Sequence, residues 1–229
     1  MKGNRRMNRT AIFHGKATLV ITLVLIVLPV FLSSCSLFRE TKTAPMVACN
    51  IAPPEPSKEP DVPYGEVNYK FPLDQVCNPK LYVFKGKRRL MVVEKDTLIR
   101  DYRIGLGPRP SGDKQVQGDG RTPEGEFYVC VKKPNSSYHK SLGLSYPSPK
   151  HAERALVAGN ISHQEFAKIV QAINSKSRPP WDTVLGGQIF IHGGGAQEDW
   201  TKGCVALYNT DIDELFEIIP VGTPVYVLP

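Results

Sequence analysis

The chain has 229 residues, of which 41% are hydrophobic and 22% are charged, so it is long enough to bury one core and to carry an appendage. Its formal charge is +7, but five of the basic residues and none of the acidic residues lie within residues 1–34. The remaining 24 basic and 22 acidic residues nearly balance. This balance argues against a nucleic-acid-binding domain, because such domains have a strong basic surplus.

The N-terminal segment has the layout of an export signal. A basic stretch ends at Lys16 and is followed by sixteen mostly apolar residues, 17–32, and then by "LSSCS". A membrane-spanning helix usually needs about 20 apolar residues, so an uncleaved anchor would be short. The motif "LSSC" resembles a bacterial lipobox, which implies a lipoprotein signal peptide over residues 1–34 and a lipid on Cys35. The alternative is an ordinary signal peptide with an incidental cysteine. If the lipobox resemblance holds, the presence of Ser36 in place of aspartate favours sorting to the outer membrane of a Gram-negative envelope.

Residues 35–78 are predicted to form an extended tether, because they are rich in proline and contain few large apolar residues. The prolines are Pro45, Pro53, Pro54, Pro56, Pro60, Pro63 and Pro72. Cys49 and Cys77 flank much of this segment and are able to pair in an oxidising compartment. Such a tether would let a lipid-anchored domain reach away from the membrane.

The folded domain is expected over residues 79–229. In its first part, 81–107, apolar and polar residues alternate around two turn-prone sites, at 85–87 and 95–96, which predicts a meander of three strands. The alternation resumes at Gly125 with "GEFYVCVKK". The loop between them, 107–125, is rich in glycine and proline, and its length in a compact domain usually indicates function or mobility.

Helices are predicted to interrupt the strands. The first covers "SPKHAERALVA" at 148–158, and the second is indicated by a capping box of Ser162 and Glu165 ahead of an apolar helix face. A strand at 188–192, a short helix that begins at Thr210 and a last strand at 223–229 complete the chain. Strands outnumber helices and no β–α–β alternation occurs, so the predicted fold class is mainly β with short helical insertions.

Cys204 and His192 are the candidate reactive pair. Cys204 follows the glycine turn "TKG", and His192 ends an apolar strand only twelve residues earlier, so a loop can return the thiol to the imidazole. A free cysteine has a pKa of about 8.5 and is mostly protonated at neutral pH, and a neighbouring imidazole can accept its proton. Taken alone, Cys204 could instead be half of a disulfide or a core residue. Cys130 is interpreted as a small buried residue, and no metal site is expected, because zinc needs three or four ligands and only two lie close together here.

Several segments together resemble the L,D-transpeptidase catalytic domain family (YkuD-like) of bacterial cell-wall enzymes. They are "GDGRTPEGEFYV", "LGLSYPSPKHAERA", "IHGG", "TKGCVAL" and "VGTPVYVL", and the resemblance covers residues 79–229. It implies a β-sandwich or barrel-like mixed sheet with the cysteine at the end of one strand. It also implies acyl transfer on peptidoglycan stem peptides, without a cofactor, in which a thioester forms on the cysteine and an acceptor amine resolves it.

The resemblance assigns a role to each residue near the cysteine. Cys204 would attack the amide between an L-centre residue, usually diaminopimelate, and a terminal D-alanine. His192 matches the base of the family, and Gly193 matches the neighbour whose backbone orients it. The N–H groups of Lys202, Gly203 and Cys204 would form the oxyanion hole.

The chain departs from the family pattern at two positions beside the cysteine. Lys202 stands where the family often has histidine, and Ala206 where it often has arginine or asparagine. These changes leave open how the donor peptide is held, for which Tyr146, Arg121, Trp200 and Lys202 are candidates. They also leave open whether the thioester passes to an amine or to water.

The predicted protein is therefore a lipid-anchored, periplasm-facing transpeptidase whose partners are stem peptides and the membrane. A hydrolase of the same fold, acting on stem peptides or on protein–peptidoglycan links, is the near alternative. A non-catalytic peptidoglycan-binding lipoprotein is the alternative from a different class, and the presence of both Cys204 and His192 argues against it.

Overall fold

The computed structural model describes residues 65–229. The predicted signal peptide, the lipidation site Cys35, Cys49 and most of the tether lie outside the described residues, so these expectations and the pairing of Cys49 with Cys77 stay predictions. Across the described range, every helix is too short or too polar to cross a membrane.

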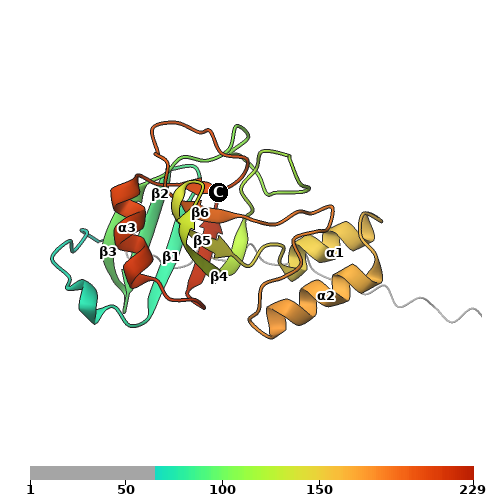
Figure 1. The fold of residues 1–229 in the computed structure, drawn as a ribbon, viewed down its shortest axis with the longest axis horizontal. Coiled ribbons are helices and arrows are strands. Elements are labelled where there is room, and N and C mark those ends of the chain that lie inside the picture. The colour runs from blue at the N-terminus through green and yellow to red at the C-terminus, as the bar shows by residue number, and fades with distance from the viewer. Residues whose placement is uncertain (1–64) are drawn as a thin grey trace, which may run out of the picture. The chain divides into compact units, whose positions relative to one another are not determined.

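One curled sheet of eight strands dominates the fold (Figure 1). The strands run in the spatial order β3-β2-β1-β8-β4-β5-β6-β7. They are β1 (Pro79–Phe84), β2 (Arg89–Glu94), β3 (Thr97–Arg103), β4 (Gly125–Ser136), β5 (His139–Leu144), β6 (Phe190–His192), β7 (Val205–Ala206) and β8 (Pro224–Leu228). The pairs β1–β8 and β6–β7 are parallel, and the other neighbouring pairs are antiparallel. The predicted three-strand meander and the mainly β, mixed-sheet fold class are confirmed.

The two ends of the sheet meet. Beyond the end of β3, Gly105 and Ala206 of β7 exchange both backbone hydrogen bonds, at 2.9 and 2.8 Å. Alternate side chains of the strands point into one core, in which Leu81, Leu90 and Ile191 are fully buried. This closure matters for the site, because β6 and β7 would otherwise form an open edge of the sheet.

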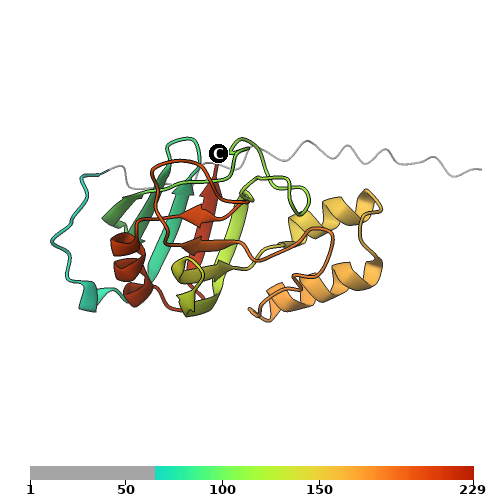
Figure 2. The same cartoon turned by 45° about the horizontal axis from the view of Figure 1, so that its top comes forward.

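Three helices accompany the sheet: α1 (Pro149–Val157), α2 (His163–Asn174) and α3 (Asn209–Ile218). The predicted capping box is present, since the Glu165 N–H donates to Ser162 Oγ at 3.2 Å and the Ser162 N–H donates to Glu165 Oε2 at 2.8 Å. Helices α1 and α2 lie together at one side of the sheet with a small core of their own, whereas α3 packs near β5 and β6 (Figures 1 and 2). Helix α3 begins at Asn209, one residue before the predicted start.

The packed part of the chain begins before the predicted boundary at residue 79. Val67, Phe71, Leu73 and Val76 lie against the hydrophobic cores of the sheet, so residues 67–78 are not part of a free tether. The packing has a local cause. Although the segment contains a proline, four apolar side chains lie close together along it and can reach the sheet. A short 3₁₀ helix, Leu73–Gln75, lies in this segment.

Two further strand predictions need correction. The segment that becomes β5 was not expected to be a strand, yet it forms a hairpin with β4. The strand predicted at 188–192 begins only at Phe190, because Gln188 has a φ of 55° and cannot continue an extended strand.

The glycine- and proline-rich loop is fastened to α1 through Asp113. The Asp113 carboxylate accepts hydrogen bonds from the backbone N–H of Glu124 at 2.8 Å and from Nε2 of His151 at 2.9 Å. Lys150 and Arg154 place nitrogen atoms 3.0 and 3.1 Å from the same carboxylate. Burial by itself raises the pKa of Asp113, but these donors outweigh it and hold the pKa far below the usual range.

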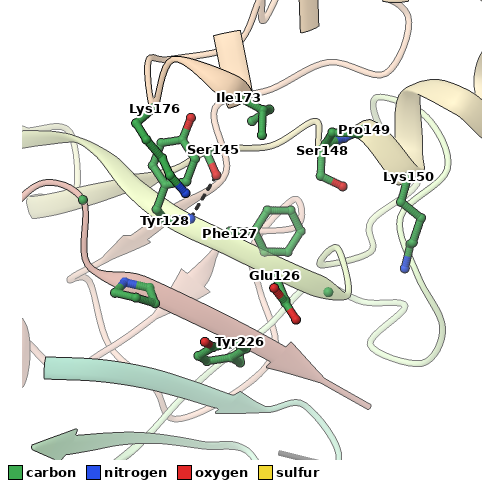
Figure 3. Close-up of a pocket in the computed structure, with 13 residues that line it drawn as sticks. Glu126, Phe127, Tyr128, Ser145, Ser148, Pro149, Lys150, Ile173, Lys176 and Tyr226 are labelled. Carbon is green, nitrogen blue, oxygen red and sulfur yellow. Dashed lines mark hydrogen bonds between the residues drawn. The ribbon is translucent and has the colours of Figure 1, made fainter. Parts of the chain in front are cut away.

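A pocket of about 450 Å³ lies where the two side helices meet the outer face of β4 and β8 (Figure 3). Tyr128 and Glu126 line it from β4, Tyr226 from β8, Lys150 from α1, and Lys176 from the turn that follows α2. Neither Cys204 nor His192 borders this pocket, so it is not the site of the predicted reactive pair.

Candidate active site

Neighbouring parallel strands bring the cysteine and the histidine together. His192 ends β6, and Cys204 directly precedes β7, where Val205 pairs with Ile191. The twelve-residue connection therefore returns the chain beside the strand that it has just left. The backbone N–H of Phe190 lies 3.4 Å from the Cys204 sulfur.

A tight turn places the thiol. Thr201 Oγ1 donates a hydrogen bond to the Cys204 carbonyl at 2.8 Å and accepts one from the Gly203 N–H at 3.2 Å. Gly203 has a φ of 125°, and a Cβ atom at this residue would lie 2.6 Å from the Arg121 carbonyl oxygen. Both the backbone conformation and the close approach require glycine, as the sequence predicted.

Of the three backbone N–H groups predicted to form the oxyanion hole, one already has a hydrogen-bond partner. The Gly203 N–H is occupied by the Thr201 hydroxyl, so its predicted role is corrected. The N–H groups of Lys202 and Cys204 have no hydrogen-bond partner within residues 65–229. These two groups remain free to bind a developing oxyanion.

The orientation of His192 is fixed by its own chain neighbour. Its Nδ1 lies 2.6 Å from the Gly193 carbonyl oxygen, and because a carbonyl only accepts, Nδ1 must carry the proton. Nε2 is then the unprotonated nitrogen. Burial lowers the pKa of His192, while the bond to Gly193 acts in the opposite direction.

Two aromatic rings enclose the imidazole. Tyr138 stacks on His192 with ring centroids 4.9 Å apart, and Trp200 meets it edge-on at 5.6 Å. The Trp200 indole N–H donates to the Gly195 carbonyl at 3.0 Å, which fixes the ring. The imidazole can therefore turn little about its side-chain bonds.

The resting thiol does not bond to the imidazole. The described contacts of the Cys204 sulfur are the Phe190 N–H and the Gln188 carbonyl, to which the thiol donates at 3.5 Å. The expected Cys204–His192 hydrogen bond is thus not formed in this structure, in which the thiol donates to the Gln188 carbonyl instead. Burial raises the pKa of Cys204, although the Phe190 N–H and the charge of Lys114 oppose this effect.

Cys204 and His192 border the same cavity, which has a volume of about 580 Å³. The hairpin of β4 and β5 forms much of its wall. The other lining residues are Lys133, Asn135, Ser136, Ser137, Tyr138, Ser141, Gln188 and Phe190. A cavity of this size can hold several residues of a peptide, with both reactive groups at its surface.

The four predicted substrate-binding residues lie in different places. Trp200 contacts His192, and Lys202 is exposed, two residues before Cys204 in the chain. Arg121 directs its Nη1 to the Asp113 carbonyl at 3.4 Å, while its backbone supports Gly203. The prediction for Tyr146 is corrected, because its side chain is fully buried and its hydroxyl donates to Leu185.

Several cavity residues were not predicted from the sequence. Tyr138 is the clearest case, since the residue is 50% exposed and yet its ring stacks on His192. It lies in the polar segment "NSSYHK", and nothing in that segment indicates a site 54 residues farther along the chain.

Cys130 is half-buried and unpaired in the described part of the chain, and burial raises its pKa to about 11. Within residues 65–229 no group of three potential metal ligands lies together.

Comparison with known proteins gives matches over this same region. The sequence model of the family described as the L,D-transpeptidase catalytic domain (YkuD) matches residues 78–227. YafK of Escherichia coli strain K12 is 28% identical over 151 residues, which are 61% of this chain and 46% of YafK. YqjB of Bacillus subtilis strain 168 is 28% identical over 155 residues, which are 66% of this chain and 71% of YqjB.

Both relatives are named as candidate L,D-transpeptidases, and this chain spans less than half the length of YafK. Among solved structures, a variant of the helical cell shape determining protein Pgp2 from Campylobacter jejuni is 20% identical with a TM-score of 0.45. That alignment covers 66% of this chain and 47% of Pgp2.

Proposed function

Because this chain belongs to the L,D-transpeptidase (YkuD) catalytic domain family, we propose that it is a cysteine acyltransferase that acts on peptidoglycan stem peptides. One observation carries the proposal. His192 has Nδ1 bound to the Gly193 carbonyl, and its imidazole borders the same cavity as the Cys204 thiol. This pairing of a base with a nucleophile is what thiol-dependent acyl transfer requires.

The first half of the reaction forms a thioester. The Cys204 sulfur attacks the carbonyl carbon of the amide between diaminopimelate and the terminal D-alanine, while its proton passes to Nε2 of His192. The N–H groups of Lys202 and Cys204 stabilise the oxyanion of the tetrahedral intermediate. When the C–N bond breaks, His192 returns the proton to the leaving amine, and D-alanine departs.

The second half resolves the thioester. An acceptor amine attacks the thioester carbonyl, His192 takes one of its protons, and the thiolate leaves and is protonated to regenerate Cys204. The raised pKa of Cys204 and the lowered pKa of His192 both favour the neutral resting pair. Proton transfer must then accompany the attack of sulfur, so the thiol has to turn from the Gln188 carbonyl towards Nε2 when the donor binds.

The test is to incubate the purified protein with a tetrapeptide muropeptide and to measure the masses of the intact protein and of the products by mass spectrometry. We expect an adduct on the protein that carries the peptide without D-alanine, and no adduct on Cys204→Ala. A carbapenem should acylate the same residue. An undiminished adduct on Cys204→Ala would contradict the assignment, and the masses of the products tell transfer to an amine from hydrolysis.

We also propose that the protein is attached to the cell envelope through a lipid on Cys35. The support is the sequence alone, in which the "LSSC" motif ends an apolar segment. A fatty-acid probe should label the wild-type chain and not Cys35→Ala, and the variant should be released into the periplasm. Equal membrane retention of both proteins would instead favour an uncleaved helix over residues 17–32.

A further inference from the structure

The wall of the catalytic cavity carries a positively charged side chain and no negatively charged one. Among the ten residues that line it, Lys133 is the single lysine or arginine, and none is aspartate or glutamate. The other polar side chains of the wall are neutral serine, asparagine, glutamine and tyrosine groups and the imidazole of His192. A cavity with one uncompensated cation favours a ligand that brings a negative charge.

Lys133 and the Cys204 thiol both contact Phe190, a residue of the cavity wall. Its Nζ is 4.8 Å from the centroid of the Phe190 ring, and the Phe190 backbone N–H is the donor to the Cys204 sulfur. The aromatic ring holds the ammonium group in place without neutralising its charge. Lys133 therefore presents a positive charge at the wall that also holds the nucleophile.

No carboxylate of the described chain pairs with Lys133, in contrast to other lysines. Four of these have a carboxylate oxygen within 3.2 Å, namely Lys85, Lys114, Lys140 and Lys150. Its neighbour Lys132 points elsewhere and donates to the Phe216 carbonyl, with its Nζ over the Phe216 ring. Of the two adjacent lysines on β4, only Lys133 is free to bind a ligand in the cavity.

We propose that Lys133 binds a carboxylate of the donor peptide and selects donors that carry it. This inference rests on the proposed function. A donor that ends in diaminopimelate and D-alanine has two free carboxylates near the scissile amide, one on the terminal D-alanine and one on the distal end of diaminopimelate. Either group can pair with an ammonium on a flexible stem, and amidation of each in turn tells them apart.

The experiment measures peptide binding in the full chain with Cys204→Ala, so that no acyl transfer follows. The ligands are the tetrapeptide, the same peptide with a terminal carboxamide, and the peptide amidated at the distal end of diaminopimelate. Lys133→Gln is compared with Lys133→Arg, which retains the charge, and with Lys132→Gln, which removes the same charge from the same strand away from the cavity. Equal melting temperatures show that the variants are folded.

We expect Lys133→Gln to raise the Kd of the unmodified peptide about three- to tenfold, as for a partly exposed charged contact, and Lys133→Arg and Lys132→Gln to leave it nearly unchanged. One of the two amidated peptides should already bind more weakly to the protein with Lys133 intact and lose nothing more in Lys133→Gln. The effect should shrink as salt is added. The amidated peptide that becomes insensitive identifies the carboxylate.

An unchanged Kd of the unmodified peptide in Lys133→Gln would overturn the inference, and so would an equal loss for all three peptides. The protein with both Cys204 and Lys133 intact supplies the separate check on function. If it forms the thioester while Lys133→Gln binds normally, only the role of Lys133 fails. If it neither binds the peptide nor forms the thioester, the proposed function fails and this inference with it.

Discussion

The Nδ1 atom of His192 lies 2.6 Å from the carbonyl oxygen of Gly193, the next residue in the chain. The partner that fixes the imidazole tautomer is therefore a backbone group, which cannot itself be protonated or lost by substitution. Gly193 has no room for a side chain, because a Cβ atom would lie 2.5 Å from Oδ1 of Asn209. Oδ1 of Asn209, the first residue of α3, also accepts a hydrogen bond from the Gly194 N–H at 2.9 Å, and this bond holds the backbone turn that orients the base.

Substitution of His192 should remove the base. We expect His192→Ala to lower the rate of Cys204 acylation by at least about a hundredfold, because loss of general acid–base catalysis typically costs about 10²–10⁴-fold. Lys202→Ala removes the basic side chain two residues before the thiol in the sequence. Lys202 is exposed, so its loss should mainly raise KM, with a smaller change in kcat. A larger fall in kcat for Lys202→Ala than for His192→Ala would show that the base is misassigned.

The pH dependence of acylation should follow the neutral form of His192. Burial lowers the pKa of this imidazole, so the acid limb of kcat/KM should lie below pH of about 6.5, the usual value for histidine. Burial raises the pKa of Cys204, so alkylation of the thiol by iodoacetamide should accelerate only above about pH 8.5. Rapid alkylation at pH 5 would instead indicate a thiolate–imidazolium pair.

Gly203→Ala should damage both the turn and the activity. The residue has a φ of 125°, which costs about 1–3 kcal/mol for a side chain, and its Cβ would collide with the Arg121 carbonyl. Gly222→Ala is the matched control, since Gly222 also has a positive φ, of 95°, but no atom lies within 4 Å of its Cβ position. Thermal unfolding should show a loss for both variants, and carbapenem acylation should be slowed only by Gly203→Ala. Equal acylation rates would contradict the close approach.

The fold was predictable where local patterns determine it. The meander of β1 to β3 follows from alternating residues around two turns, and the start of α2 follows from the Ser162–Glu165 capping box. Strand β5 was missed because its sequence, "HKSLGL", is short and contains glycine, and only its pairing with β4 and β6 makes it a strand. The packing of residues 67–78 was missed for the same reason, since it depends on contacts with distant strands.

The site was predictable in its reactive centre and not in its walls. Cys204, His192 and Gly203 lie in one short stretch whose turn chemistry is visible in the sequence. Tyr138 and Lys133 reach the cavity from another hairpin, so no spacing along the chain connects them with the cysteine. Tyr146 was misjudged because an aromatic residue near a motif has the same appearance in sequence whether it lies in a cavity or in the core.

Asp113 provides a test of how the loop supports the site from a distance. Its carboxylate joins the loop at 107–125 to α1 through His151 and Arg154, and the same loop supplies the Arg121 carbonyl that lies against Gly203. Asp113→Asn keeps the shape of the side chain but removes the negative charge that His151 and Arg154 face. We expect it to lower the free energy of unfolding by about 2–4 kcal/mol at pH 7, and to slow acylation of Cys204 by a smaller factor than Gly203→Ala does.

The stabilisation by Asp113 should depend on pH with a definite sign. Its pKa lies far below the usual value in the folded protein, whereas the unfolded carboxyl titrates near about 3.9. The contribution is therefore complete above about pH 5 and is lost as the pH falls below about 4, because the unfolded chain then binds a proton that the folded chain does not. Denaturant unfolding between pH 7 and pH 3 should show a steeper fall for the wild-type protein than for Asp113→Asn. Glu153→Gln, an exposed change on α1, should follow the wild-type curve, and parallel curves for all three proteins would mean that the Asp113 cluster contributes no net charge stabilisation.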